Sequence, residues 1–149
     1  MFLGSDTHTL DPKGRVVLPS RFRGQLSDGC VITKGQERQL LVFPPDEYAR
    51  QAEAVRNRPG TRANRRFQRQ FFSSADAQSL DKAGRLLVRA ELRAWADLLE
   101  GEDVRVIGVA DHIELWNPAA YEADAAEGEA IYTWDEEDEL DESEDADDR

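Results

Sequence analysis

The ten residues 10–19 read LDPKGRVVLP, and they decide the fold because the chain repeats them. Residues 80–89 read LDKAGRLLVR, in which Leu, Asp, Gly and Arg keep their places at an offset of 70. The likeness extends beyond this stretch, since LLVFPPDEY from Leu40 aligns with IELWNPAAY from Ile113 at an offset of 73. The sequence therefore contains a duplicated unit of about forty residues.

Each copy opens with a turn whose residues have identifiable structural roles. Asp11 and Asp81 stand at the first position of a type I turn, and Gly14 and Gly84 stand at the fourth. An Asp carboxylate at that position accepts hydrogen bonds from turn N–H groups, while Gly tolerates the positive φ that such a turn requires. The runs VVL and LLV follow the turns. We therefore predict a hairpin at the start of each copy, with these four residues as structural turn residues.

A short helix and two further strands follow each hairpin. After Pro19 we expect a helix with Phe22 and Leu26 facing inward. The second helix is predicted to bury the residues at its i, i+3, i+4 and i+7 positions and to stop at Gly101; these residues are Leu92, Trp95, Ala96 and Leu99. About forty residues cannot bury a sufficient core alone. The two copies should therefore interleave their strands in one closed, pseudo-twofold barrel.

Four segments follow from this organisation. Residues 1–50 form the first repeat, 51–76 an Arg-rich helical connector, 77–121 the second repeat, and 122–149 an acidic tail. Thr61 can cap the second connector helix, which carries four arginines on one stripe: Arg62, Arg65, Arg66 and Arg69. The tail is too poor in apolar residues to offset the entropy of ordering, so we predict that it is disordered.

The whole-chain net charge of −12 conceals a strong asymmetry. Residues 122–149 contain 15 acidic residues and one basic residue, a net charge of −14. Residues 1–76 contain 13 basic and 8 acidic residues, a net of +5, and residues 77–121 contain 5 basic and 8 acidic residues, a net of −3. The acidic composition belongs to the tail, and the basic first half of the folded part, residues 1–76, is compatible with a nucleic-acid partner.

Several classes of protein are disfavoured by what the sequence contains. It has no apolar run long enough for a membrane span, and MFLGSDTH does not resemble a signal peptide. Cys30 is the single cysteine, and His8 and His112 have no partners at metal-ligand spacing. We find no catalytic residue set and no phosphate-binding loop. The expectation is a cytoplasmic protein that is not an enzyme, with no cofactor, no metal, no membrane association and no small-molecule substrate.

The stretches LDPKGRVVLPSRFR, SLDKAGRLLV and RANRRFQRQFF together resemble the MraZ family, which has tandem SpoVT-AbrB-type domains. This resemblance implies an α+β, mainly β fold: an AbrB-like swapped-hairpin barrel with short helices. It also implies a sequence-specific, nucleoid-associated regulator that assembles into a homo-oligomeric ring. Such a regulator binds short direct repeats of double-stranded DNA in the promoter of its own division and cell-wall gene cluster, usually as a repressor.

The resemblance also assigns candidate DNA contacts. The first group lies in and after the first turn: Lys13, Arg15, Arg21 and Arg23. Residues that could contact either DNA or a neighbouring subunit are Lys82, Arg85, Arg62, Arg65, Arg66 and Arg69. Because Lys82 and Arg85 lie in the acidic half, we expect the first turn to read DNA and the second to be mainly structural. The alternative is a protein-interaction scaffold or antitoxin-like module whose acidic tail binds a partner.

Overall fold

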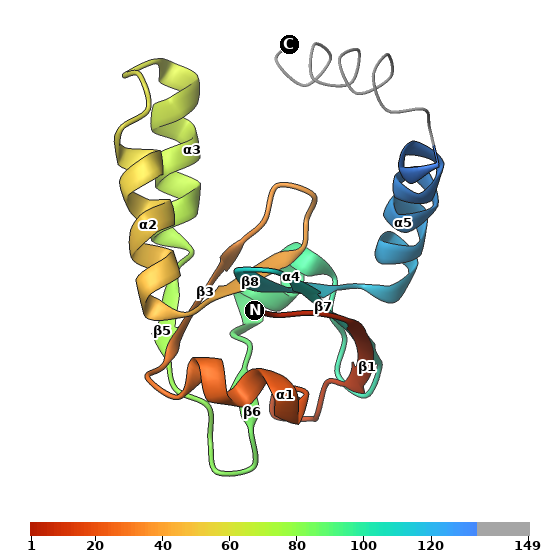
Figure 1. Cartoon of the computed structure of the whole chain (residues 1–149). Helices are drawn as coiled ribbons and strands as arrows, with labels where there is room; N and C mark the ends of the chain where they lie inside the picture. Colours follow the sequence, from red (N-terminus) through yellow and green to blue (C-terminus); the bar gives the residue numbers. More distant parts are fainter. Residues whose placement is uncertain (134–149) are drawn as a thin grey trace. The chain divides into compact units, whose positions relative to one another are not determined.

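A computed structural model describes residues 1–133 of the chain (Figure 1). The first repeat contains β1 (Ser5–Thr9), β2 (Arg15–Val17), α1 (Ser20–Arg23), the 3-10 helix η1 (Gly24–Leu26), β3 (Cys30–Lys34) and β4 (Leu40–Phe43). Helix α2 (Pro45–Arg56) begins at the end of the first repeat and continues into the connector, which also contains α3 (Arg62–Ser73). The second repeat contains β5 (Asp76–Gln78), β6 (Arg85–Leu87), α4 (Ala90–Ala96), β7 (Asp103–Val109) and β8 (His112–Trp116), and α5 (Pro118–Tyr132) follows. The α+β class is confirmed.

The two repeats interleave their strands, as the duplication predicts. A six-stranded sheet has the order β1-β7-β8-β4-β3-β5, and a separate two-stranded sheet pairs β2 with β6. Exchanging each strand for its counterpart in the other repeat (β1 for β5, β2 for β6, β3 for β7 and β4 for β8) gives the same order read backwards. The sheets therefore have pseudo-twofold symmetry, and the edge strand of each repeat pairs with a strand of the other repeat.

The strand pairing differs from the single closed barrel that the sequence predicts. Within residues 1–133 the hydrogen-bonded strands form two sheets, and β1 and β5 are the edges of the larger one. The link between the sheets on the first-repeat side is one isolated bridge, from Leu10 to Val16. The turn residues at 11–14 take the chain out of the larger sheet before β2 begins. The second strands of the two predicted hairpins, β2 and β6, therefore pair with each other in a separate two-stranded ribbon.

The ribbon covers the core with one of its faces. Val16 and Leu86 lie opposite each other in the β2–β6 register, and both are fully buried. They join a core that includes Leu10, Leu18 and Val88, which are also inaccessible to solvent. Because strand side chains alternate between faces, burying these two central residues leaves the flanking positions of each strand on the outer face.

Helix α1 and the buried side chains that follow it match the sequence prediction, whereas the end of α4 does not. Phe22 and Leu26 are buried. Helix α4 ends at Ala96 because Asp97 adopts a left-handed conformation, with φ 53° and ψ 49°. The Leu98 N–H then bonds to the Arg93 carbonyl at 2.9 Å, which closes the helix C-terminus. The prediction that Leu99 is buried and that the helix continues to Gly101 is therefore wrong: Leu98 is buried and Leu99 is exposed.

The connector forms a hairpin of two helices. The side chain of Thr61 accepts a hydrogen bond from the Asn64 N–H, as predicted for the start of α3. Aromatic contacts join the two helices, since Tyr48 stacks on Phe71 with ring centroids 5.6 Å apart. Thr33 of β3 donates its hydroxyl to the Phe71 carbonyl at 2.8 Å, which ties α3 to the sheet.

The end of the described chain corrects one prediction about the acidic tail. The chain divides into a unit of Met1–Pro118 and a second unit that begins at Ala119. Residues 122–132, predicted to be disordered, belong to α5. The helix is rich in alanine, the best helix former, and the densest acidic run begins only at Asp135. The prediction for residues 134–149, including the tail-mediated partner, lies outside the described residues. Among residues 1–133, no helix has the length and apolar character of a membrane span.

Candidate nucleic-acid interface

The two turns have the same hydrogen-bond geometry. In the first, Asp11 Oδ1 accepts from the Lys13 and Arg15 N–H groups, both at 2.9 Å. The other oxygen, Oδ2, accepts from Arg15 Nε at 2.7 Å. The Gly14 N–H bonds to the Asp11 carbonyl at 3.0 Å, and Gly14 has φ +79°. One carboxylate thus fixes both the backbone of the turn and the direction of the arginine that follows it.

The second turn repeats these contacts with a different local sequence. Asp81 Oδ1 accepts from the Ala83 N–H at 3.0 Å and the Arg85 N–H at 2.9 Å, and Oδ2 accepts from Arg85 Nε at 2.6 Å. Gly84 has φ +76°. In both turns the arginine is held through Nε, and a guanidinium carries four further N–H donors on its two Nη atoms. Those donors form the fork that suits a phosphate or the edge of guanine.

Both arginines lie on the same face of one ribbon. In the β2–β6 register Arg15 lies opposite Leu87, and Arg85 lies opposite Val17. Because directly opposed residues share a face, these four side chains form the outer face of the ribbon, with Arg15 and Arg85 on a diagonal about 7–8 Å apart. The exposed fractions are 26% for the Arg15 side chain and 35% for Arg85. Lys13 and Lys82 are exposed on the turns that flank the ribbon.

A reciprocal contact locks each turn to the opposite repeat. The Leu18 N–H donates to the Gly84 carbonyl at 3.0 Å, and the Val88 N–H donates to the Gly14 carbonyl at 2.8 Å. The Arg23 guanidinium lies where a Cβ on Gly84 would be, and Arg93 occupies the same place over Gly14. These glycines are therefore required both by their positive φ and by the close approach of an arginine.

This contact gives Arg23 a structural position. Its Nε donates to the Leu18 carbonyl at 3.1 Å, and the side chain is half-buried against the second turn. Arg21 also has partners, because its guanidinium pairs with Asp6 and its Nε donates to the Leu3 carbonyl at 3.1 Å. The structure thus places Arg15 and Lys13 at the ribbon, whereas Arg21 and Arg23 tie α1 to β1 and to the second turn.

The arginine stripe of α3 lies apart from the ribbon. Figure 1 shows the free end of the α2–α3 hairpin pointing away from the turn between β5 and β6. The four residues Arg62, Arg65, Arg66 and Arg69 are all exposed. Arg65 donates to the Gly60 carbonyl at 2.5 Å, and Arg66 lines a groove beside Trp95 and Phe67. The stripe is a second basic surface and does not extend the first.

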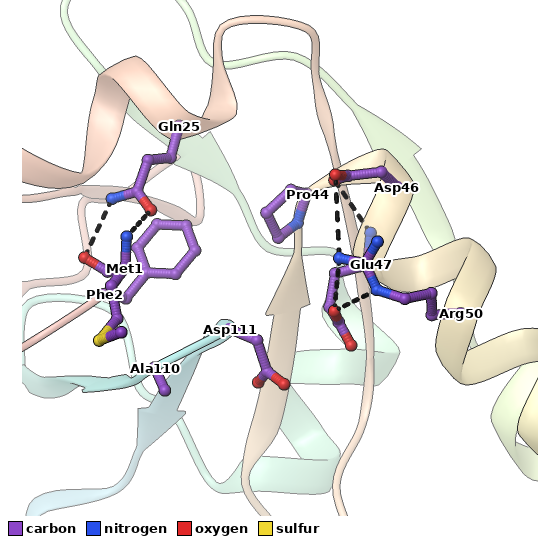
Figure 2. Close-up of a pocket in the computed structure, with 9 residues that line it drawn as sticks. All are labelled: Met1, Phe2, Gln25, Pro44, Asp46, Glu47, Arg50, Ala110 and Asp111. Atoms are coloured by element: carbon purple, nitrogen blue, oxygen red, sulfur yellow. Dashed lines mark hydrogen bonds and ion pairs between the residues drawn. The ribbon is translucent and has the colours of Figure 1, made fainter.

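A cavity of about 480 Å³ lies elsewhere, beside the N-terminus (Figure 2). The Met1 ammonium donates to Gln25 Oε1 at 2.6 Å. Across the cavity, Arg50 Nε donates to the buried Glu47 carboxylate at 2.8 Å. The cavity contains none of the residues predicted from the sequence to bind DNA. Its polar side chains largely bond to one another.

The two histidines lie outside any metal-binding cluster. Within residues 1–133 there is no group of three or more His, Cys, Asp or Glu side chains that could hold a metal ion. His112 lies between Asp111 and Glu114, with ring-nitrogen distances of 2.7 and 2.9 Å. Burial acts to lower its pKa, but hydrogen bonds to the two carboxylates outweigh burial and raise the pKa above its ordinary value of 6.5. Cys30 is buried in the core, and this burial raises the pKa of its thiol to about 12.

Three residues of this surface are not among those predicted from the sequence. Arg93 packs on Gly14, and its signal is its place 70 positions after Arg23. Val17 and Leu87 share the outer face with the arginines, which the period-two alternation from Arg15 and Arg85 could have indicated. Alternation alone does not say that β2 pairs with β6, so the joint face becomes evident only from the fold.

The turn carboxylates predict a response to acid. Hydrogen bonds from the Arg85 backbone N–H and guanidinium, opposed by partial desolvation, hold the pKa of Asp81 below its ordinary value of 3.8. A lowered folded-state pKa stabilises the fold fully above pH 3.8, and this stabilisation is lost as the pH falls through the folded value. A carboxyl-carbon NMR titration should place the Asp81 pKa below 3.8, and Asp81→Asn should remove its share of the acid sensitivity. Titration of Asp81 at 3.8 or higher would contradict the turn geometry.

Comparison with known proteins agrees with the tandem turns. The family model described as MraZ protein matches twice, over residues 1–70 and 71–142. A protein of Salinispora arenicola named "Transcriptional regulator MraZ" is 46% identical over 130 residues, covering 87% of this chain and 90% of that protein. Proteins with the same name from Kineococcus radiotolerans and Roseiflexus castenholzii are 48% and 42% identical, covering 83% and 82% of this chain and 85% of each relative. The resemblance inferred from the residues is confirmed, and the chain belongs to the MraZ family.

Proposed function

We propose that this chain is a sequence-specific DNA-binding transcriptional regulator and that the outer face of the β2–β6 ribbon enters the major groove. The observation that carries the proposal is the placement of Arg15 and Arg85 on one outer, partly exposed face, each oriented by an aspartate. The major groove admits a two-stranded ribbon, and arginine is the side chain that most often reads guanine there. The relatives' names, which call them transcriptional regulators, agree with this function.

The symmetry of the ribbon supports a role for both turns. Lys13 and Lys82 stand on the flanking turns, so the surface offers basic side chains at both of its ends. The net charge of −3 in residues 77–121 suggested from the sequence that the second turn was mainly structural. The acidic residues of that half are spread over turns, loops and single positions of α4, β7 and β8, and one of them, Asp81, is the partner that orients Arg85. Arg85 itself lies opposite Val17 of the first repeat.

The finer assignment follows the family resemblance. We propose that the protein represses the promoter of its own division and cell-wall gene cluster by binding short direct repeats as a ring of subunits, in the cytoplasm and on the nucleoid. One ribbon has few side chains that could read bases. Several ribbons on repeated sites gain affinity by acting together, because each later contact is intramolecular.

The proposal predicts binding to the DNA upstream of the chain's own gene, with a steep dependence on salt. Each phosphate neutralised by a lysine or arginine lowers log K by about 0.9 per unit of log salt concentration. Footprinting should show protected short repeats. Affinity measured from 50 to 200 mM salt should give a slope of about −3.6 if one ribbon neutralises roughly four phosphates. A flat salt response, or no protection of the upstream DNA, would refute the proposed interface.

A further inference from the structure

The outer face of the ribbon carries one large apolar side chain that the fold leaves uncovered. Leu87 is 44% exposed, and it lies directly opposite Arg15 in the register. Its neighbour Leu86 faces the core and is fully buried. Isolated exposed leucines are ordinary on protein surfaces. The distinguishing feature of Leu87 is its place among the side chains that would face DNA.

A side-chain clamp fixes the backbone of Leu87. The Leu87 N–H donates to Gln78 Oε1 at 3.0 Å, and Gln78 Nε2 donates to the Leu87 carbonyl at 2.8 Å. Gln78 Nε2 also donates to Asp76 Oδ2 at 2.8 Å, which orients the amide. The amide thus supplies the paired hydrogen bonds that a neighbouring strand would otherwise provide. The open edge of β6 is held in place just where Leu87 projects.

The first repeat has no such clamp. His8 occupies the place that corresponds to Gln78, and Val17 the place that corresponds to Leu87, at the same offset of 70. Within residues 1–133, the His8 side chain makes no paired contact with the Val17 backbone. The ribbon is therefore symmetric in its arginines and asymmetric in its apolar positions. A rigid, larger apolar group is present on the β6 side alone.

We propose that Leu87 is a specificity-determining residue that packs against the 5-methyl group of a thymine, next to the base or phosphate contacted by Arg15. This inference rests on the proposed function and deepens it. In the major groove only thymine presents a methyl group, so an apolar side chain there distinguishes a thymine position from the other bases. The rigid backbone limits the entropy that Leu87 loses on contact.

The test compares thymine with deoxyuracil, which lacks only that methyl group. The probe is the DNA upstream of the chain's own gene, with each thymine of the protected region replaced singly by deoxyuracil. For the wild-type protein, one such replacement per repeat should weaken binding about fourfold, the effect of uncovering one methyl-sized apolar group. Leu87→Ala should bind the thymine-containing DNA about fourfold more weakly than the wild-type protein does. Its affinity should not fall further when that thymine is replaced by deoxyuracil.

Leu3→Ala is the matched control. Leu3 is 61% exposed and precedes β1, whereas the first turn follows β1, so the length of β1, about 17 Å, separates Leu3 from the first turn. This variant should keep the wild-type response to deoxyuracil. Sedimentation of Leu87→Ala should give the wild-type mass, because the proposal places Leu87 against DNA.

The results that overturn the inference are distinct from those that overturn the function. Wild-type affinity for Leu87→Ala, or an undiminished deoxyuracil effect in that variant, would show that Leu87 does not contact a thymine methyl group. A change in the sedimenting mass of Leu87→Ala would assign this side chain to a contact between copies. Failure of the wild-type protein to bind the upstream DNA at all would instead remove the proposed function.

Discussion

Arg15→Ala and Arg85→Ala should each weaken binding to the protected upstream DNA about tenfold or more, and the double variant should abolish specific binding. Both side chains lie on the outer face of the ribbon and are pre-oriented by Asp11 and Asp81. Loss of one bidentate arginine contact to a base costs about 1–3 kcal/mol, and 1.4 kcal/mol corresponds to a factor of ten. A gel-shift titration against an excess of unrelated DNA measures the loss.

Two control variants distinguish specific DNA contacts of the ribbon from the non-specific attraction of any basic side chain to DNA. Arg62→Ala removes an exposed arginine of α3 and should leave affinity nearly unchanged. Arg15→Lys keeps the charge but loses the planar fork, so it should retain non-specific binding while losing discrimination. Neither alanine variant at the ribbon should shift the unfolding transition by more than about 1 kcal/mol, because both ion pairs are partly exposed. If Arg85→Ala bound the upstream DNA with wild-type affinity, only the first turn would contact DNA, and the proposal that both turns do so would be wrong.

Phe2→Ala should destabilise the fold by about 3–5 kcal/mol, although the residue is second in the chain. Phe2 is 1% exposed and makes an edge-to-face contact with Phe22, with centroids 5.3 Å apart. Its N–H and carbonyl bond to Ala110 at 2.7 and 2.9 Å, which extends the pairing beside β7. Chain ends ordinarily fray at little cost. This one is anchored by a core side chain.

Urea unfolding of Phe2→Ala measures this loss against Leu3→Ala. Leu3 is 61% exposed, and its replacement should change stability by no more than about 0.5 kcal/mol. Gly108 packs against the backbone of Leu3 and Phe2, which fixes the path of the N-terminal segment. The segment therefore cannot relax into the space that Phe2→Ala would leave. A loss below 1 kcal/mol for Phe2→Ala would show that the N-terminal segment can detach from the core.

The sequence was most informative where a local rule acts alone. Asp11 and Gly14 define a turn by their own chemistry, and the repeat at Asp81 and Gly84 doubles the signal. The strands after each turn and the Thr61 cap follow from equally local patterns. The end of α4 was mispredicted because Asp97 in the left-handed conformation ends the helix without a glycine. No local sequence pattern predicts the left-handed conformation of Asp97, since it depends on how Leu98 packs into the core.

The composite surface could not be found in the same way. Arg15 and Arg85 are 70 residues apart, and each repeat read separately places its arginine at the start of a short strand. Only the pairing of β2 with β6 puts the two on one face. Charge totals by segment pointed away from Arg85, because summed charge ignores where side chains lie. Arg23 shows a role that the family resemblance did not assign, because its guanidinium lies over Gly84 and ties α1 to the second turn.

The central claim is that both turns form one DNA-binding face. Amide hydrogen exchange of the full-length protein, measured by mass spectrometry with and without the footprinted upstream DNA, tests it most directly. DNA should slow exchange in residues 11–17 and 81–87 together and leave residues 62–73 of α3 unchanged. Protection confined to one turn, or to α3 without the ribbon, would contradict this interface.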